Sequence, residues 1–331
     1  MSSTPLLHIN ALGIDLLLDG ALRTVVHRAD VTVPEGAAVA LVGESGSGKS
    51  LTARSVMGLL PRNARINGDV LFAGESVPRM KPARLRAFRA TEVAMVFQDP
   101  RSHINPARSI GDFLIEGLTT TRRVPTAEAA RKVTEILREV GIADAGRRMR
   151  QRPHELSGGL LQRVMIAAAL AAEPRLLLAD EPTTALDVTT QEEVMAIIGE
   201  AREARGLSML FITHDLELAT AVCDRVVVMY AGTTVEELPA GRLRGHAAHP
   251  YTRALLASRP SVSDAAAELR SIPGSPLSGF EAPDGCAFSE RCAHVQDLCR
   301  NDQPQPTSAG DATVACHFPR TCTPEEAAGH A

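Results

Sequence analysis

A glycine-rich stretch near the N-terminus has the residue types and the spacing that bind phosphate. Residues 43–50 read GESGSGKS and fit the pattern G-x-x-x-x-G-K-[ST]. The apolar run at 38–42 predicts a strand before this stretch, and a helix is expected from about Lys49. Glycines let successive backbone N–H groups converge on phosphate oxygens, and the helix N-terminus adds positive partial charge. We therefore predict a site for a nucleoside triphosphate, with Lys49 at the β- and γ-phosphates and Ser50 on Mg²⁺.

A pair of carboxylates ends a second apolar run. Residues 175–182 read RLLLADEP, which predicts a buried strand followed at once by Asp180 and Glu181. In a chain with a phosphate loop, Asp180 is placed to hold Mg²⁺ through water, and Glu181 to orient and deprotonate the attacking water. The predicted nucleotide-binding residues are Gly43, Glu44, Ser45, Gly46, Ser47, Gly48, Lys49, Ser50 and Asp180.

A second helix start able to bind an anion occurs at the sequence LSGG. Ser157, Gly158 and Gly159 run directly into a helical pattern, and such a bare helix N-terminus favours negative charge. Two phosphate-binding helix starts in one chain suggest a sandwich, in which this start completes the nucleotide site of a second subunit. Two further polar residues follow apolar runs, Gln98 after VAMV and His214 after SMLFIT, and neither indicates a function by itself.

These side chains need strands and helices to position them, and the pattern between Gln98 and Leu156 is helical. The segment TAEAARKVTEILREVG predicts a helix capped by Thr126. Its apolar residues would share one face: Ala129, Val133, Ile136, Leu137 and Val140. We expect residues 101–170, approximately, to form a helical lobe inserted into the nucleotide-binding core.

Five motifs in this order resemble the ATP-binding cassette (ABC) family: GESGSGKS, FQDP, LSGG, LLLADEPTTALD and ITHD. The resemblance implies an α/β fold, the ABC-type P-loop nucleotide-binding domain, with a RecA-like core, an antiparallel β subdomain and the inserted helical lobe. It implies ATP and Mg²⁺ as ligands and Glu181, His214 and Gln98 as catalytic residues. Gln98 would contact Mg²⁺ and the attacking water, His214 would contact the γ-phosphate, and Asp187 would line the seam between two subunits.

Two features depart from the family's pattern. Leu160 follows the LSGG motif where the family commonly has glutamine. The family also stacks an aromatic ring on adenine, whereas this chain has no Phe, Tyr or Trp before Phe72. Adenine would then have weaker contacts, or contacts made by residues 16–18.

The last third of the chain resembles the C-terminal extension of ATPases that serve dipeptide and oligopeptide permeases, in particular their D-type subunits. The segments that carry this resemblance are HPYTRALLASRP, IPGSPLSGFEAPDGCAFSERC and VACHF. Expected boundaries are 1–258 for the nucleotide-binding domain and 259–331 for the extension. The expected function is ATP hydrolysis that powers the import of short peptides. Nickel, glutathione or short oligosaccharides are alternative cargoes, and a non-transport ABC ATPase is a less favoured class.

Such an ATPase implies partners. They are a second ABC ATPase subunit, two transmembrane permease subunits and an extracytoplasmic substrate-binding protein. The resemblance favours a sister chain, and thus a heterodimer, over self-pairing. The expected location is the cytoplasmic face of the membrane, as a peripheral subunit. A translation-type relative would carry two cassettes, and a regulatory subunit would lack Glu181 or His214, so both classes fit less well.

Four cysteines in the extension have the residue type of a metal site: Cys286, Cys292, Cys299 and Cys316. Their spacing lacks the short C-x₂-C of zinc ribbons, and four sulfur ligands suit zinc or an iron–sulfur cluster equally well. The resemblance to D-type subunits favours a [4Fe–4S] cluster, with Zn²⁺ as the alternative. Cys223, expected in a helix of the core, and Cys322 are interpreted as thiols outside this site.

Composition restricts the class of protein further. The formal net charge of −4 gives no electrostatic reason to expect a nucleic-acid partner. No apolar run approaches the about 18–20 residues that span a bilayer, and the N-terminal residues do not resemble a secretory signal. A reducing cytoplasm is therefore expected, where clustered cysteines hold metal more often than they form disulfides.

Overall fold

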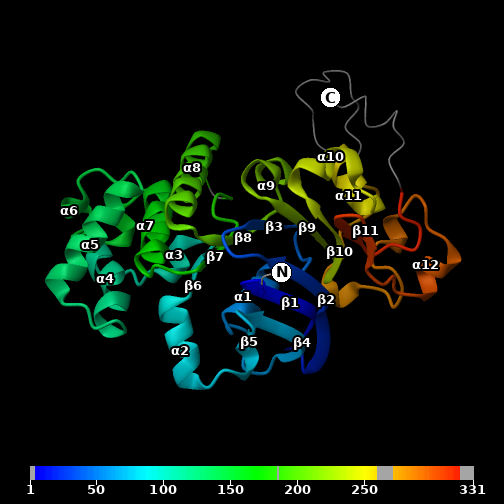
Figure 1. The fold of residues 1–331 in the computed structure, drawn as a ribbon, viewed down its shortest axis with the longest axis horizontal. Coiled ribbons are helices and arrows are strands. Elements are labelled where there is room, and N and C mark those ends of the chain that lie inside the picture. The colour runs from blue at the N-terminus through cyan, green and yellow to red at the C-terminus, as the bar shows by residue number, and fades with distance from the viewer. Residues whose placement is uncertain (1–3, 185, 259–270, 321–331) are drawn as a thin grey trace. The chain divides into compact units, whose positions relative to one another are not determined.

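The computed structural model describes residues 4–184, 186–258 and 271–320, and the chain divides into two compact units (Figure 1). The helical unit comprises the described parts of Met1–Leu6, Val33–Ala37 and Glu75–Ile212. The phosphate-loop unit comprises those of Leu7–Thr32, Ala38–Gly74 and Thr213–Ala331. Each unit is therefore assembled from segments that lie far apart in the sequence.

A mixed sheet forms the centre of the phosphate-loop unit, with the strand order β4-β1-β2-β10-β9-β3. These strands are β1 (Leu7–Leu18), β2 (Ala21–Val33), β3 (Ala38–Val42), β4 (Arg65–Phe72), β9 (Arg225–Tyr230) and β10 (Thr233–Pro239). β1 runs antiparallel to β4, and β3 runs parallel to β9. All five residues of β3 are buried, as expected of a short, continuously apolar strand covered on both faces.

The α-helices in the described part of this unit are α1 (Lys49–Val56), α9 (Leu216–Val222), α10 (Leu243–His246), α11 (Pro250–Ala257) and α12 (Asp297–Asn301). A hairpin of β11 (Thr307–Ala309) and β12 (Ala312–Val314) follows α12. β12 pairs antiparallel with β10, with Val314 opposite Glu236. The C-terminal segment thus adds a strand to the sheet of the phosphate-loop unit.

Three parallel strands position the polar residues of the helical unit. They are β6 (Val93–Val96), β7 (Leu176–Asp180) and β8 (Ser208–Thr213), with β7 paired to β6 and β8. The described part of this unit also contains β5 (Glu75–Ser76) and the α-helices α2 (Pro82–Thr91), α3 (Pro100–His103), α4 (Ile110–Thr120), α5 (Thr126–Glu139), α6 (Ala145–Arg148), α7 (Gly158–Ala171) and α8 (Val188–Arg205). α4, α5 and α7 pack against one another (Figure 1).

Most local expectations from the sequence are confirmed. The strand at 38–42 and the helix from Lys49 have the predicted bounds. The five residues predicted to share one face of the helix at 126 are all at most 3% exposed. The predicted cap is wrong, because α5 begins at Thr126 and Pro125 occupies the N-cap position. The Pro125 carbonyl accepts the N–H groups of Glu128 and Ala129, so a hydroxyl cap is not needed.

The placement of Cys223 inside a helix is also wrong. Cys223 is the C-cap of α9 and has extended backbone angles, φ −119° and ψ 152°. Its side chain is buried, at 8% exposure. Cys322 lies outside the described residues. The boundary between residues 258 and 259 remains a prediction.

Candidate functional site

The phosphate loop connects β3 to α1 and needs glycine at two positions for steric reasons. A Cβ atom on Gly43 would lie 2.0 Å from the carbonyl oxygen of Met229. Gly48, the N-cap of α1, has a φ of +96°, and its Cβ would lie 3.0 Å from a methyl carbon of Val26. Side chains at these positions would push the loop away from β9 and β2, so glycine permits the close approach.

Lys49 is the buried cation of this loop. Its side chain is 5% exposed, and Nζ donates to the carbonyl oxygens of Gly43 and Glu44 at 2.8 Å each. A longer contact of 3.4 Å joins Nζ to the hydroxyl of Ser47. The ammonium group therefore lies within the loop, at the N-terminus of α1, where an anion is favoured.

Glu181 and Gln98 meet in the helical unit. Gln98 lies two residues after β6, and its Nε2 donates to Oε2 of Glu181 at 3.1 Å. Thr184 Oγ1 donates to the same oxygen at 2.7 Å. Glu181 directly follows β7 with a φ of +45°, a strained value for a residue with a side chain. Strain and two donors together hold one carboxylate oxygen in a fixed direction.

Asp180 and His214 are two further predicted site residues that lie at the ends of strands. Asp180 is the last residue of β7 and is 2% exposed. His214 directly follows β8 and is exposed, and belongs to the phosphate-loop unit. Asp215, next in the chain, caps α9 by accepting the N–H groups of Glu217 and Leu218.

The LSGG motif begins α7, as the sequence predicted. Ser157 is the N-cap, and its Oγ accepts the N–H of Leu160 at 3.4 Å. Ser157 and Gly158 are exposed, which leaves this helix start accessible. Gly159 approaches α8 closely, because a Cβ there would lie 2.9 Å from a methyl carbon of Thr190.

Asp187 is the N-cap of α8. It accepts from the N–H of Thr190 at 3.0 Å and from the Thr190 hydroxyl at 2.8 Å. These hydrogen bonds from Thr190 lower the pKa of Asp187. Asp187 is therefore an exposed carboxylate that remains ionised at neutral pH.

The four cysteines of the extension line one pocket. Cys286, Cys292, Cys299 and Cys316 share it with His249 and Phe288, among others. Burial raises the pKa of Cys286 to about 11 and also raises those of Cys292 and Cys316. No disulfide joins the described cysteines. Within residues 4–184, 186–258 and 271–320, no group of three or more His, Cys, Asp or Glu side chains is arranged to hold a metal ion.

Sequence reasoning missed three residues that the structure places at these sites. Thr184 donates a hydrogen bond to Glu181. Its position in the sequence, three residues after the predicted base, is a signal that could have indicated this contact. His249 also lines the cysteine pocket, although it precedes Cys286 by 37 residues in the sequence. Arg291 contacts the phosphate loop, and no local pattern indicates a contact over that separation.

Comparison with known proteins decides the family. Residues 26–184 match the family model described as ABC transporter, and residues 235–299 match the C-terminal region of oligopeptide/dipeptide transporters. The oligopeptide transport ATP-binding protein OppD of Salmonella typhimurium is 39% identical over 314 residues, covering 95% of this chain and 94% of OppD. The chain belongs to the ABC transporter family.

Other ABC proteins agree in sequence and in fold. A Brucella abortus protein whose name describes a peptide import ATP-binding protein is 41% identical over 326 residues, 98% of each chain. This chain is also similar to a dimeric structure of the ATP-binding cassette MJ0796 in a post-hydrolysis state, bound to ADP and Pi. The TM-score is 0.64 at 25% identity, and the match covers 71% of this chain and 98% of MJ0796. The fold is thus that of an ABC ATPase, mixed α/β with a curled sheet. Among the described residues, no helix of this ABC protein has the length and apolar character of a membrane span.

Proposed function

We propose that this chain is the ATP-hydrolysing subunit of an ABC importer and that it powers the uptake of short peptides. The observation that carries this proposal is the combination in one chain of an ABC region with a peptide-transporter C-terminal region, matched along nearly the full length of OppD. The fixed carboxylate of Glu181 supports the catalytic part of the proposal.

In the proposed chemistry, residues 43–50 wrap the phosphates of ATP. Backbone N–H groups and the ammonium of Lys49 bind the phosphate oxygens, while Ser50, Gln98 and Asp180 hold Mg²⁺ directly or through water. Mg²⁺ supplies charge neutralisation for the developing phosphoryl charge when it is bound.

Glu181 accepts a proton from the attacking water on its carboxylate, which Gln98 and Thr184 orient. A general base must hold the water in line with the γ-phosphorus, and the two donors fix the direction of the Glu181 carboxylate for this purpose. His214, exposed after β8, contacts the γ-phosphate in this proposal.

The accessible start of α7 serves the site of a second subunit. Ser157, Gly158 and Gly159 bind the γ-phosphate across the interface, and Asp187 lines the seam. We propose a sister ATPase as this second subunit, two transmembrane permeases as further partners and an extracytoplasmic binding protein that delivers cargo. The complex places this chain at the cytoplasmic face of the membrane.

We further propose that the extension, residues 259–331, holds a [4Fe–4S] cluster between Cys286, Cys292, Cys299 and Cys316. The donor set fits, because four thiols from separate segments surround one pocket. Zn²⁺ is the alternative metal, because four sulfur ligands also suit zinc.

A buried polar atom at the same pocket supports this assignment. The ring of His249 is 1% exposed, and its Nδ1 accepts the N–H of Tyr251 at 3.0 Å. Burial lowers the pKa of His249 to about 3, so the neutral ring carries its proton on Nε2. Within the described residues this N–H has no hydrogen-bond partner. A sulfide or thiolate in the pocket would supply the missing acceptor.

The experiment is reconstitution of this chain with its permeases and binding protein in liposomes. ATP-dependent uptake of labelled di- to hexapeptides should occur, and Lys49→Ala should abolish it. Uptake of nickel, glutathione or a short oligosaccharide with no uptake of peptides would overturn the assigned cargo. ATP hydrolysis with no transport of any of these solutes would overturn the importer itself.

A further inference from the structure

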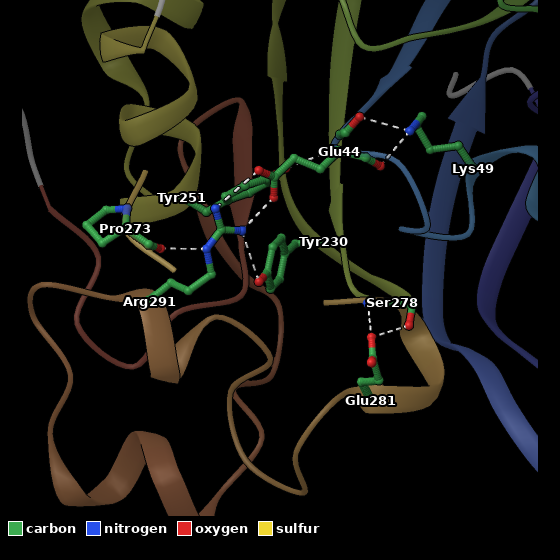
Figure 2. Close-up of polar contacts among 9 residues, drawn as sticks. Glu44, Lys49, Tyr230, Tyr251, Pro273, Ser278, Glu281 and Arg291 are labelled. Atoms are coloured by element: carbon green, nitrogen blue, oxygen red, sulfur yellow. Dashed lines mark hydrogen bonds and ion pairs between the residues drawn. The ribbon is translucent and has the colours of Figure 1, made fainter. Parts of the chain in front are cut away.

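An arginine of the C-terminal extension makes a direct ion pair with the phosphate loop. Arg291 ends the short 3₁₀ helix Ser289–Arg291, one residue before Cys292. Its Nη1 donates to Oε2 of Glu44 at 2.7 Å, and its Nη2 donates to Oε1 at 3.2 Å (Figure 2). Glu44 is the second residue of the loop GESGSGKS. The contact is bidentate, the geometry that binds guanidinium to carboxylate most specifically.

Two further hydrogen bonds hold the Arg291 side chain in place. Its Nε donates to the carbonyl of Pro273 at 2.9 Å, and Nη1 also donates to the hydroxyl of Tyr230 at 3.2 Å (Figure 2). The side chain is only 5% exposed, against 21% for Glu44. Arg291 is therefore a fixed positive charge at the edge of the loop.

Glu44 is held at its side chain and at both of its backbone polar groups. Arg291 binds the carboxylate, and the N–H of Glu44 donates to the hydroxyl of Tyr251 at 3.0 Å. The Glu44 carbonyl accepts from Lys49 Nζ at 2.8 Å (Figure 2). The direction of the carbonyl that orients Lys49 thus depends on groups outside the loop.

A second contact joins the extension to the same loop. Gly46 lies against Ser278, so that a Cβ on Gly46 would be 3.4 Å from the Cβ of Ser278. Ser278 is the N-cap of the 3₁₀ helix Gly279–Glu281, and its N–H donates to the Glu281 carboxylate (Figure 2). The carbonyl of Gly279 lies 2.7 Å from Nε2 of His27 on β2. Ser278 and Arg291 are 13 residues apart in the extension, so the extension supports the loop at two separate points.

We propose that Arg291 is a positioning residue for ATP binding, through which the C-terminal extension holds the phosphate loop and neutralises Glu44. The inference rests on the proposed binding of ATP by residues 43–50. Two physical effects carry it. Loss of the guanidinium would free Glu44 to move the carbonyl that orients Lys49, and small displacements of a binding group are costly. It would also leave an unpaired carboxylate next to a site for a polyanion.

The test is the binding of Mg·ADP to the full chain by calorimetry. Arg291→Met should weaken binding about tenfold, equivalent to about 1.4 kcal/mol. Arg291→Lys should give an intermediate loss, because lysine keeps the charge but not the fork. The double variant Glu44→Gln/Arg291→Met should bind more tightly than Arg291→Met alone, because the unpaired charge is gone. Arg300→Met, an exposed arginine of α12, is the matched control and should bind like the wild type.

A second measurement separates positioning from general destabilisation. In the assembled ATPase, Arg291→Met should raise KM for ATP about tenfold and change kcat by less than about twofold. If Arg291→Met fails to fold, Arg291→Lys takes its place, and the double variant Glu44→Gln/Arg291→Lys takes the place of Glu44→Gln/Arg291→Met. Wild-type affinity in Arg291→Met or Arg291→Lys, or an equal loss in Arg300→Met, would overturn the inference. Unchanged binding in Lys49→Ala would instead overturn the proposed nucleotide site.

Discussion

The amide of Gln98 and the carboxylate of Glu181 meet through a hydrogen bond of 3.1 Å. The two residues are 83 positions apart, yet they follow neighbouring parallel strands, β6 and β7. The carboxyl ends of parallel strands lie at one edge of a sheet, so strand order brings the amide of Gln98 to the proposed base. Thr184 adds a third group three residues beyond Glu181.

This relationship predicts the effect of removing the base alone. Glu181→Gln keeps the shape of the side chain and its hydrogen bonds but cannot accept the proton. ATP binding should persist, while the rate of hydrolysis in the assembled complex should fall by about 10²–10⁴. Thr184→Val should give a smaller loss, because Gln98 still orients the carboxylate. Hydrolysis by Glu181→Gln at the wild-type rate would show that another group is the base.

The exposed start of α7 predicts that two variants act at different sites. Lys49→Ala should weaken ATP at the phosphate loop of this chain, whereas Ser157→Arg should damage the site on the opposite subunit. Occupancy of each site in a heterodimer, measured with a photoreactive ATP analogue and mass spectrometry, distinguishes the two. If both variants emptied the same site, the head-to-tail arrangement of the subunits would be wrong.

The cysteine pocket predicts bound iron. Protein purified without oxygen should be brown, absorb broadly at about 400 nm and contain about four irons per chain. Cys286→Ala should lose colour and iron, whereas Cys223→Ala, the matched control outside the pocket, should keep both. Colourless protein with one zinc per chain would replace the cluster by a zinc site, and metal-free protein would remove both assignments.

His249 predicts a change in reduction potential without a change in iron content. An N–H donor to a cluster sulfur stabilises the more negative, reduced form. His249→Phe keeps a ring of similar size but removes the Nε2 donor, together with the Nδ1 acceptor of the Tyr251 N–H, so the potential should become more negative. The control is His246→Phe, an exposed residue of α10. An unchanged potential in His249→Phe would mean that Nε2 does not contact the cluster.

Glu173 predicts an acid dependence of stability in the helical unit. Lys132 and Arg122 contact its carboxylate at 2.6 and 3.2 Å, and these contacts, Lys132 foremost, lower its pKa. Because the folded pKa is lowered, the stabilisation is present above the unfolded value of about 4.3 and is lost as the pH falls through the folded pKa.

Urea titrations of wild-type protein and Glu173→Gln should therefore differ at about pH 7 and converge at about pH 3. The difference should stay below about 1 kcal/mol, because the Glu173 side chain is 56% exposed. Glu203→Gln, at an exposed position of α8, is the control. A constant difference over this pH range would assign the effect to something other than the ion pairs.

The sequence predicts the elements that carry the motifs because their signals are local. The apolar run before Gly43 and the acidic end of β7 need no knowledge of distant residues. Pro125 was missed because a cap was expected from a hydroxyl, whereas the proline carbonyl accepts the N–H groups of Glu128 and Ala129. Arg291 could not be found in this way, because its partner Glu44 is 247 residues away and arginine is common in the chain. The neutral ring of His249 likewise became visible only through its burial.

The pairing of β12 with β10 has a consequence for synthesis. Val314 enters the sheet of the phosphate-loop unit 270 residues after Glu44 of the loop. Chains emerge from the ribosome N-terminus first, at about 5–20 residues per second, so residues 43–50 are made long before Arg291 and β12. A nascent chain would thus expose the edge of β10 and an unbraced loop until Arg291 and β12 have been made. The proposed nucleotide site would then gain its brace well after its own residues have left the ribosome.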